Sequence, residues 1–301
     1  MKLGIDIGGS HIGIGVVSKE GKILEKTEKR ITAEEKKDIK KAIEDYIIEC
    51  FNNYSKKYKV TSVGIAIPGT LNDREIIKSV NLGVKNYDIV GKLEEKIKIP
   101  IKIKNDAKCA AIAENEYGCL KKYNRSIFLT LGTGIGGAVI IKNKLLDTGN
   151  LSGCEIGHMV IKQGGLECNC GRQGCFEKYA SMKNFKNKLR KELGFTEKTR
   201  GEELLNMIRN NKPGQENYET IERVVSEFIE DLSTGIANLI NIFEPEAIGI
   251  GGSFVFFEDV LMQRLKNKLK EPHILFNTRE DIIIETAILG NDAGIIGATL
   301  I

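Results

Sequence analysis

The sequence lacks any run of apolar residues long enough to cross a lipid bilayer. Its N-terminus passes directly into the strand-like pattern Lys2-Leu3-Gly4-Ile5, which leaves no room for a signal peptide. We therefore expect a cytoplasmic protein with no membrane partner. In that reducing compartment the 7 cysteines are poor candidates for disulfides, and three of them lie close together.

The chain also lacks a strong excess of either charge. Its 45 basic and 41 acidic residues leave a net charge of +4, spread along Lys/Glu-rich helical stretches. A nucleic-acid-binding protein more often concentrates basic residues on one face, so we expect a solvated surface and no nucleic-acid partner. With 301 residues, 41% of them hydrophobic, the chain can form one large or two medium globular domains.

A strand, a glycine turn and a second strand occur in this order twice. The first copy is Leu3–Ile7, Gly8-Gly9 and Ile12–Val17, and the second is Ile127–Leu131, Gly132–Gly137 and Ala138–Ile141. Such a repeat predicts two similar α/β domains whose turns approach one cleft. A chance similarity between two short segments is the alternative.

Other segments predict the elements around this repeat. Residues 33–58 and 217–242 have the apolar spacing of amphipathic helices. A buried strand from Val60 to Ile67 stops at Pro68-Gly69, and the strand Ile99–Ile103 leads to Asn105-Asp106 and a helix that reaches Glu116. A closing helix is predicted at 291–301.

The turn Asp6-Ile7-Gly8-Gly9-Ser10 has the composition of a phosphate-binding turn. Its two glycines let backbone amides approach an anion, and the Ser10 hydroxyl adds a donor. Asp6 would repel phosphate unless a cation lay between them, so it suits Mg²⁺ bound through water. The turn leads to a strand and fits neither the Walker nor the Rossmann pattern. A tight hairpin turn with an incidental aspartate is the structural alternative.

Two further glycine clusters follow strands. Gly132, Thr133 and Gly134 suit contact with phosphate, and Gly251 and Gly252 could admit an adenine or ribose. Each cluster is weak evidence alone, whereas three in one chain favour a nucleotide site.

One histidine and three cysteines have the composition of a metal site. His158, Cys168, Cys170 and Cys175 supply four ligands, the number needed for a closed tetrahedral zinc site. Two glycines within the loop permit the tight turn that brings the sulfurs together. Because no coordination position would stay open, the zinc would be structural. Free thiols in a loop are the alternative.

With these motifs in this order, the sequence resembles the ROK family (repressors, open reading frames and kinases), particularly its bacterial glucokinases, over essentially the whole chain. Asp6–Ser10 resembles the family's D-x-G-G-T phosphate motif, with serine in place of threonine. The other matching segments are Pro68-Gly69, Asn81-Leu82, Asn105-Asp106-Ala107, Gly153–His158, Cys168–Glu177 and Leu289–Gly294.

The resemblance implies the family's fold, an actin-like (ribonuclease H-like) duplicated two-domain α/β fold with a cleft between the domains. We expect a small N-terminal domain of residues 1–116, completed by the helix at 291–301. A large domain of residues 117–290 would carry the zinc loop. The resemblance to the family further implies that the protein forms a homodimer or a homotetramer.

The resemblance also implies a function, the ATP-dependent phosphorylation of a hexose primary hydroxyl, with glucose as the first choice and Asp106 as the catalytic base. ATP and Mg²⁺ would be required, and Zn²⁺ would be structural. Sugar hydroxyls would be bound by Gly69, Asn81, Asn105, Glu155, His158 and Glu177. ATP would be bound by Asp6, Gly8, Gly9, Ser10, Gly132, Thr133, Gly134, Gly251 and Gly252.

Two departures from the family pattern affect the substrates. His11 stands where a lysine commonly follows the phosphate motif, and it either handles the nucleotide or is a plain strand residue. Gly83-Val84-Lys85 stands where an aromatic residue often follows Asn-Leu. The choice among glucose, N-acetylmannosamine, fructose and allose therefore stays open.

Two other classes of function are alternatives to a kinase. Family repressors carry an N-terminal helix-turn-helix domain, whereas Met1 here lies immediately before the first strand, which disfavours a sugar-responsive repressor. A non-enzymatic actin-like protein is disfavoured because Asp106 is retained together with the phosphate turns.

Overall fold

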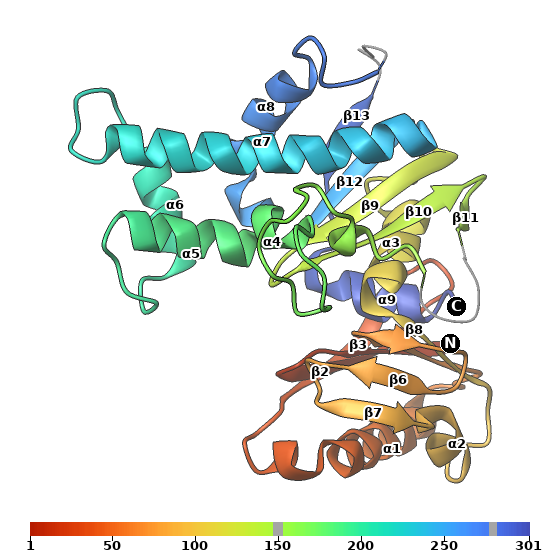
Figure 1. The fold of residues 1–301 in the computed structure, drawn as a ribbon. Coiled ribbons are helices and arrows are strands. Elements are labelled where there is room, and N and C mark those ends of the chain that lie inside the picture. The colour runs from red at the N-terminus through yellow and green to blue at the C-terminus, as the bar shows by residue number, and fades with distance from the viewer. Residues whose placement is uncertain (147–152, 277–281) are drawn as a thin grey trace. The chain divides into compact units, whose positions relative to one another are not determined.

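The computed structural model describes residues 1–146, 153–276 and 282–301, which divide into two compact units (Figure 1). The first unit combines Met1–Lys122 and Asn143–Cys154 with Ile288–Ile301, and the second combines Tyr123–Lys142 with Glu155–Ala287. No helix within the described ranges is long and apolar enough to span a membrane.

The first unit is built on a mixed five-stranded sheet with the strand order β3-β2-β1-β4-β8. Its strands are β1 (Lys2–Ile7), β2 (His11–Val17), β3 (Ile23–Arg30), β4 (Val63–Ile67) and β8 (Ile101–Asn105). β1, β2 and β3 are antiparallel neighbours, whereas β1, β4 and β8 run parallel. The carboxyl ends of the three parallel strands therefore lie at one edge of the sheet, where Asp6, Ala66 and Lys104 are in register.

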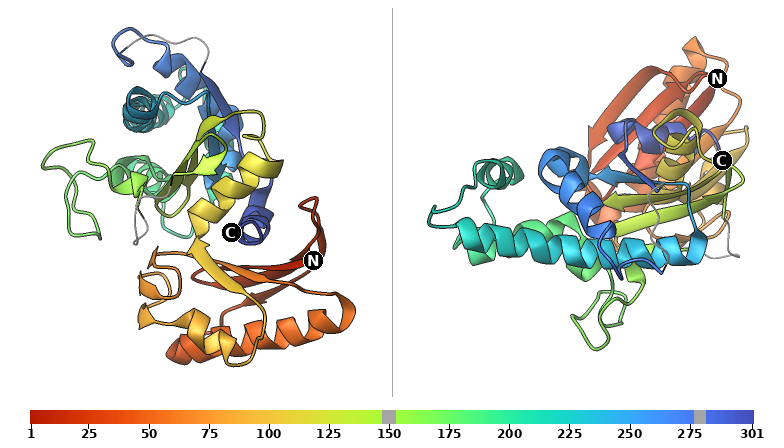
Figure 2. Two further views of the ribbon diagram at one scale, coloured as in Figure 1. Left: turned by 90° about the vertical axis from the view of Figure 1, so that its right-hand side faces the viewer. Right: turned by 90° about the horizontal axis from the view of Figure 1, so that it is seen from above.

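Helices flank this sheet on both faces (Figure 2). They are η1 (Glu35–Asp38), α1 (Ile39–Lys57), α2 (Ile89–Glu94), α3 (Asp106–Tyr117), η4 (Gly290–Asp292) and α9 (Ala293–Ala298). Alternate residues of a strand face opposite sides of the sheet. Leu3, Ile5 and Ile7 of β1 accordingly share a hydrophobic core with Ile43 and Ile47 of α1.

Glycines on the opposite face of the sheet allow α9 to approach its backbone. A Cβ atom added to Gly4 would lie 2.0 Å from the carbonyl oxygen of Ile295, and one added to Gly64 would lie 1.6 Å from that of Ala298. α3 packs beside α9. No larger side chain fits between α9 and the sheet at these two positions. Because α9 lies directly on the sheet backbone there, the C-terminal segment forms one layer of the first unit.

A small antiparallel sheet with the strand order β5-β6-β7 follows β4. Its strands are β5 (Thr70–Leu71), β6 (Ile76–Ser79) and β7 (Val84–Tyr87). Buried Ile76, Val84 and Tyr87 join the core that α1 shares with the large sheet. The small sheet is thus fixed to the first unit through its own apolar residues.

The second unit contains α7 and most of a second mixed five-stranded sheet, whose strand order is β11-β10-β9-β12-β13. The strands are β9 (Arg125–Leu131), β10 (Ile135–Ile141), β11 (Lys144–Leu145), β12 (Ala247–Gly252) and β13 (Ile283–Thr286). β9 and β10 are antiparallel, whereas β12 is parallel to β9 and to β13. The remaining elements are η2 (Ile156–His158), α4 (Glu177–Ala180), α5 (Met182–Glu192), α6 (Gly201–Arg209), α7 (Tyr218–Phe243), η3 (Ser253–Phe257) and α8 (Glu258–Leu269).

The 26-residue helix α7 organises the helical layer of the second unit, because α4, α5 and α8 all pack against it (Figure 1). Its buried stripe includes Val224, Phe228 and Leu232. Phe228 contacts Phe185 of α5, with ring centroids 4.5 Å apart. The helix predicted at 217–242 is therefore confirmed, and its apolar stripe faces the neighbouring helices.

The two sheets share one construction, an antiparallel hairpin whose first strand also pairs in parallel with a later strand. β1 pairs with β2 and β4 in the first unit, and β9 pairs with β10 and β12 in the second. The predicted duplicated α/β fold is confirmed. The domain boundaries predicted for 1–116 with 291–301 and for 117–290 stay predictions.

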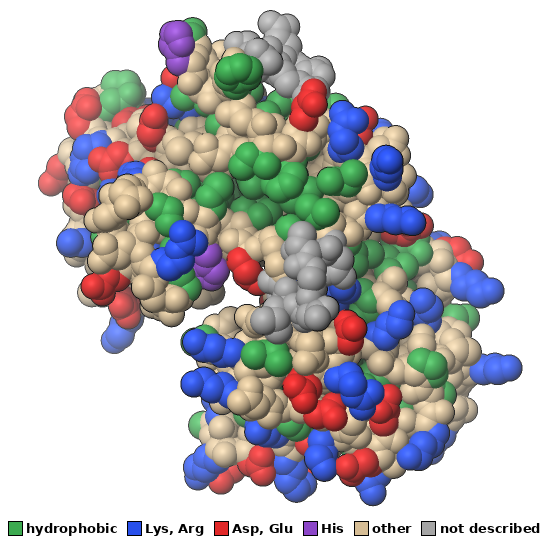
Figure 3. All heavy atoms as spheres, turned by 45° about the vertical axis from the view of Figure 1, so that its right-hand side comes forward, with side chains coloured by type: hydrophobic (Ala, Val, Ile, Leu, Met, Phe, Trp, Pro, Cys, Tyr) green, Lys and Arg blue, Asp and Glu red, His purple; other side chains and the backbone are tan. Residues whose placement is uncertain are grey.

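Charged side chains of both signs are interspersed on the face drawn in Figure 3. Many form ion pairs within one unit. Arg264, for example, donates two hydrogen bonds to the carboxylate of Glu222, and Lys26 pairs with Asp292 at 2.7 Å. Each such surface pair contributes little to stability, since water and salt screen it.

Candidate functional site

Several predicted site residues gather at the carboxyl edge of the first sheet. Asp6 is near the end of β1, Asn105 ends β8, and Asp106 begins α3. The Asn105 side chain connects two of these segments, because its Nδ2 donates to the carbonyl oxygen of Gly69 at 3.2 Å. Gly69 has φ +123° and lies against β6, where an added Cβ would be 2.4 Å from the carbonyl oxygen of Lys78. The loop after β4 is therefore fixed to the strand that carries Asn105.

Asn105 and Asp106 together form the start of α3. The Oδ1 atom of Asn105 caps the helix by accepting from the backbone N–H groups of Ala107 at 3.1 Å and Lys108 at 3.3 Å. Asp106 accepts from the N–H of Ala107 through Oδ1 at 2.8 Å. Burial raises the pKa of the Asp106 carboxyl above its usual 3.8, and the hydrogen bond from Ala107 opposes that rise. The arrangement gives a fixed carboxylate that is more basic than one in water.

Asp6 is the second perturbed acid at this edge. Burial, and then the negative charge of Asp106, raise the pKa of the Asp6 carboxyl to about 7, while Lys26 lowers it. The Asp6 carboxylate also lies against α9, since a Cβ added to Gly294 would be 2.4 Å from Oδ2 of Asp6. Burial and the nearby charge of Asp106 both disfavour ionisation of Asp6, so a divalent cation, which would supply the missing positive charge, suits this position. The oxygen donor set is the kind that Mg²⁺ prefers, so Asp6 fits its predicted role.

The predicted phosphate turn joins β1 to β2. The N–H of Gly8 donates to the carbonyl oxygen of His11 at 2.8 Å and closes the turn. A Cβ added to Gly9 would lie 3.2 Å from the carbonyl oxygen of Asn81, so a predicted sugar-binding residue lies beside the predicted nucleotide turn. Ser10 is exposed, and its Oγ is 2.9 Å from Nδ1 of His11.

The two predicted nucleotide clusters of the second unit also lie on neighbouring strands. The turn between β9 and β10 is closed by the N–H of Gly132, which donates to the carbonyl oxygen of Gly134 at 3.0 Å, and Thr133 between them is exposed. β12 runs parallel to β9, with Gly251 opposite Thr130. Gly252 follows with φ +72°, a conformation that favours glycine. These clusters therefore share one edge of the second sheet.

The four predicted metal ligands are close together in the second unit. Their ligand atoms all lie within 4.8 Å of one another. Nδ1 of His158 is 3.5 Å from Sγ of Cys168, and the Sγ atoms of Cys170 and Cys175 are 3.6 Å apart. Tetrahedral zinc with Zn–S bonds of about 2.3 Å separates two sulfurs by about 3.8 Å. Both the donor set and the spacing fit a structural zinc ion.

The loop that carries the cysteines is folded by its own backbone. The N–H of Cys168 donates to the carbonyl oxygen of Arg172 at 2.8 Å, and that of Gly174 donates to Leu166 at 2.8 Å. A Cβ added to Gly174 would lie 1.8 Å from the carbonyl oxygen of Lys162. The loop can bring its sulfurs together because glycine occupies this position.

Glu177 connects the metal ligands to the glycine turn of the second unit. Its Oε1 accepts from the thiol of Cys168 at 3.3 Å and is 3.9 Å from Nδ1 of His158. On the other side of the carboxylate, a Cβ added to Gly134 would lie 2.5 Å from Oε2 of Glu177. Glu155, predicted to bind sugar, is exposed and precedes η2, which ends at His158.

The structure thus brings the predicted residues together as one set in each unit. The first set is Asp6, Gly8, Gly9, Ser10, Gly69, Asn81, Asn105 and Asp106, and the second is Gly132, Thr133, Gly134, Gly251, Gly252, Glu155, His158, Glu177 and the three cysteines. The sequence reasoning missed Lys26 and Gly294, which lie near Asp6. Gly294 belongs to a segment that resembles the family, whereas Lys26 lies on the mostly exposed strand β3 and gave no signal.

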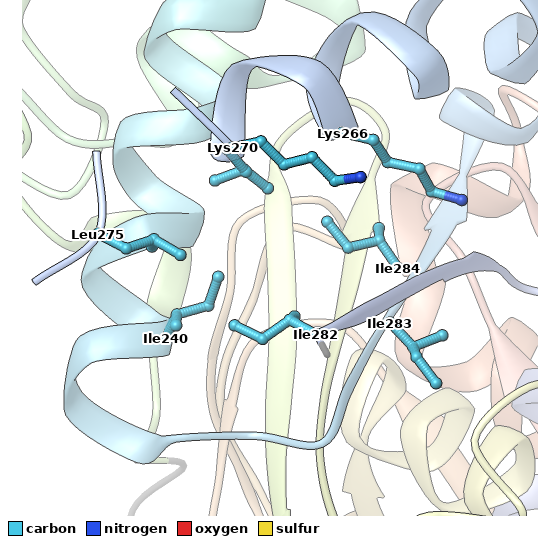
Figure 4. Close-up of a pocket in the computed structure, with 8 residues that line it drawn as sticks. Ile240, Lys266, Lys270, Leu275, Ile282, Ile283 and Ile284 are labelled. Atoms are coloured by element: carbon cyan, nitrogen blue, oxygen red, sulfur yellow. The ribbon is translucent and has the colours of Figure 1, made fainter. Parts of the chain in front are cut away.

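A separate cavity of about 250 Å³ lies among α7, α8 and β13 in the second unit (Figure 4). Its walls are mainly apolar and include Ile240, Leu275 and Ile284, while Lys266 and Lys270 extend along one side. None of the residues predicted for sugar, nucleotide or metal lines this cavity.

Comparison with known proteins relates both sets of residues to one family. A profile described as the ROK family matches residues 2–301. The chain is 31% identical to the glucokinase of Streptomyces coelicolor over 310 residues, which cover 99% of this chain and 96% of that enzyme. It is 27% identical to the xylose repressor of Bacillus subtilis over 270 residues, which cover 89% of this chain and 68% of the repressor.

Among solved structures, the fold is similar to that of a ROK family glucokinase from Streptomyces griseus in complex with glucose and AMPPNP. The TM-score is 0.80 at 28% sequence identity, and the match covers 99% of this chain and 97% of the other. Because the family profile spans nearly every residue and the first relative matches from end to end, this chain belongs to the ROK family.

Proposed function

We propose that the protein is an ATP-dependent sugar kinase that phosphorylates the primary hydroxyl of a hexose, with glucose as its preferred substrate. The carboxylate of Asp106 is the main structural support, since it is fixed at the start of α3 and made more basic by burial. The glucokinase relatives support the choice of reaction and of sugar, because they match this chain over nearly their full length.

In this proposal Asp106 is the catalytic base. The hydroxyl oxygen forms a bond to the γ-phosphorus, the bond from that phosphorus to the β,γ-bridging oxygen breaks, and ADP leaves. The hydroxyl proton passes to Asp106 and then to solvent. The N–H of Ala107 holds Oδ1 of the carboxylate, so that Oδ2 can accept this proton without rotation of the side chain. Positioning of this kind supplies much of the rate, because little covalent chemistry falls to the protein.

The remaining sugar hydroxyls would be bound by polar groups from both sets. Asn105 and Gly69 are already joined by a hydrogen bond, and Asn81 lies beside the phosphate turn. Glu155 and Glu177 can each accept two hydroxyl hydrogen bonds. His158 directs Nδ1 toward Cys168, so its other ring nitrogen, Nε2, would contact the sugar.

The nucleotide would be bound by the glycine-rich turns of both units. Backbone amides at Gly8 and Gly9 and the Ser10 hydroxyl would donate to phosphate oxygens, and Asp6 would hold hydrated Mg²⁺. The bound cation neutralises charge that develops on the phosphates during transfer. Zn²⁺ on the cysteine loop would be structural and would fix the orientation of His158.

The same proposal includes the organisation of the chain. Residues 1–116 with 291–301 and residues 117–290 would act as two domains on one pair of substrates. The protein would assemble as a homodimer or homotetramer, as the family resemblance implies.

A transcriptional repressor is the second candidate, since the chain also matches a xylose repressor. The extent of the matches favours the kinase. The chain covers 96% of the glucokinase but 68% of the repressor, so about a third of the repressor has no counterpart in this match.

A coupled assay of ADP formation tests the proposal across glucose, N-acetylmannosamine, fructose and allose. We expect sugar-dependent ADP formation, with the highest kcat/KM for glucose. A higher kcat/KM for another sugar would change the proposed substrate and leave the proposed kinase reaction standing. No ADP formation with any of the four, in the presence of Mg²⁺, would reject the kinase proposal.

A further inference from the structure

The serine and histidine that end the phosphate turn are joined through their side chains. Ser10 Oγ and His11 Nδ1 are 2.9 Å apart. The backbone on either side is fixed, because the carbonyl oxygen of His11 accepts from Gly8 at 2.8 Å and that of Ser10 accepts from Ile31 at 2.8 Å. The two side chains therefore extend from a constrained turn.

This contact contributes little to the stability of the fold. Both residues are exposed, so water can replace either partner at small cost. Side chains of neighbouring residues in a strand also point to opposite faces, so the pair forms only because Ser10 is still in the turn. The contact therefore leaves the Ser10 hydroxyl accessible to a ligand at the turn.

The position of one proton decides what Ser10 can do. If Nδ1 carries a proton, it donates to Oγ, and the hydroxyl proton of Ser10 is free to point elsewhere. If Nδ1 is bare, it accepts that hydroxyl proton, and the serine presents only lone pairs to its surroundings. A phosphate oxygen has lone pairs alone at neutral pH, so it can bind Ser10 in the first state and is repelled in the second.

We propose that His11 is a positioning residue that turns the Ser10 hydroxyl proton toward a phosphate of the bound nucleotide. This inference rests on the proposed kinase function and assigns a role to the residue that departs from the family pattern. Nucleotide binding selects the state in which Nδ1 carries a proton.

The charges around His11 come from the strands that flank β2. On β3, Arg30 is the direct register partner of His11, and Lys29 and Glu28 are opposite the next two residues of β2. On β1 the charged residue at this end is Asp6. α9, which packs on the same face of the sheet, has no charged residue, and α1 covers the opposite face. The two cations and two anions named here balance, and Lys29 already pairs with Glu35 at 2.5 Å, so Arg30 is the cation directly beside His11.

Steady-state kinetics with ATP and glucose test the inference in four variants. His11→Ala and Ser10→Ala should each raise KM for ATP about tenfold, equivalent to about 1.4 kcal/mol. KM for glucose and the melting temperature should not change. The double variant should be no worse than either single variant, because both remove the same oriented proton. His11→Asn should keep the KM of the wild type, since its amide nitrogen takes the place of Nδ1 and always donates.

Rescue by His11→Asn is a readout that a purely structural role would not move, because asparagine keeps a hydrogen-bond donor at this position and loses the ring. His273→Asn is the matched control, since His273 is exposed in the second unit and its φ of +71° suits asparagine.

Two results would overturn the inference alone. One is a KM for ATP in His11→Ala that equals that of the wild type. The other is an increase in KM for ATP in the double variant that equals the product of the two single increases. A His11→Asn variant as poor as His11→Ala would also contradict it. By contrast, a wild-type protein that neither phosphorylates a hexose nor binds AMPPNP in a calorimeter would reject the proposed function itself.

Discussion

Glu114 and Leu289 are 175 residues apart in the sequence, yet the N–H of Leu289 donates to Oε1 of Glu114 at 2.8 Å. The same oxygen accepts from Ile288 at 3.0 Å, and Oε2 accepts from the N–H of Cys119 at 2.9 Å. The Glu114 side chain is fully buried in α3. One carboxylate therefore satisfies three backbone donors and attaches the C-terminal segment to the end of α3.

Glu114→Gln should destabilise the protein by about 2 kcal/mol, because an amide cannot accept on both sides and leaves a buried N–H without its partner. Urea unfolding monitored by circular dichroism measures the change. Glu116→Gln is the control, since Glu116 is exposed on the same helix. Equal stabilities for the two variants would show that water replaces the carboxylate.

Asp6→Asn should stabilise the protein at high pH and leave it unchanged at low pH. Because the folded protein raises the pKa of Asp6 from 3.8 to about 7, ionisation costs more in the folded state than in the unfolded chain. Below about pH 4 the carboxyl is protonated in both states and adds nothing. The cost grows as the pH rises to 7 and is then constant, at about 2–4 kcal/mol. Asparagine avoids this cost.

Thermal unfolding of wild type and Asp6→Asn at pH 4, 6 and 8 checks the sign. The difference should be near zero at pH 4 and largest at pH 8, while kinase activity is lost because Mg²⁺ is no longer held. A stabilisation that is the same at all three pH values would point to packing against Gly294 as its cause.

Asp106→Asn should bind glucose normally and lose turnover by about 10²–10⁴-fold, since the amide keeps the shape of the side chain but accepts no proton. Calorimetry measures sugar binding and the coupled assay measures kcat. Asp73→Asn, an exposed aspartate in the same unit, provides the control. Near-normal kcat in Asp106→Asn would remove it from the role of base.

Metal analysis of protein purified without chelators should find about one zinc per chain, as one four-ligand site requires. Cys175→Ser should lose the metal and unfold at a lower temperature, because the loop then lacks its cross-link. Cys50→Ala is the control, since Cys50 lies in the core of the first unit, away from the cluster. Zinc-free wild-type protein with full stability would argue for free thiols.

Periodicity and turn chemistry were enough to predict the main elements. The two strand–glycine–strand segments are the hairpins β1–β2 and β9–β10, and α7 spans Tyr218–Phe243 against a predicted 217–242. The segment predicted as one helix at 33–58 is η1 followed by α1, because Asp38 caps α1 by accepting from the N–H of Lys41. The sheet β5-β6-β7 was not predicted, since strands of two to four residues carry too little alternation to recognise.

The site was predictable where chemistry is concentrated in short motifs, such as Asn105-Asp106 and the cysteine loop. Contacts between distant segments were not. The carboxylate of Glu114, the pairing of Lys26 with Asp292 and the approach of Gly294 to Asp6 all depend on where the C-terminal segment packs. The contact of Ser10 with His11 was also not predicted, although the two residues are adjacent. Side chains of adjacent residues in a strand are expected to point to opposite faces.

The position of α9 also has a consequence for biosynthesis. The layer that covers Gly4 and Gly64 consists of residues 293–298, which leave the ribosome last of all the elements in this unit. Until then the part of the first sheet around Gly4 and Gly64 has no cover, and the donors of Ile288 and Leu289 have not reached Glu114. β1 therefore cannot be covered at Gly4 until α9 has been translated, whereas the segments of the second unit can meet earlier.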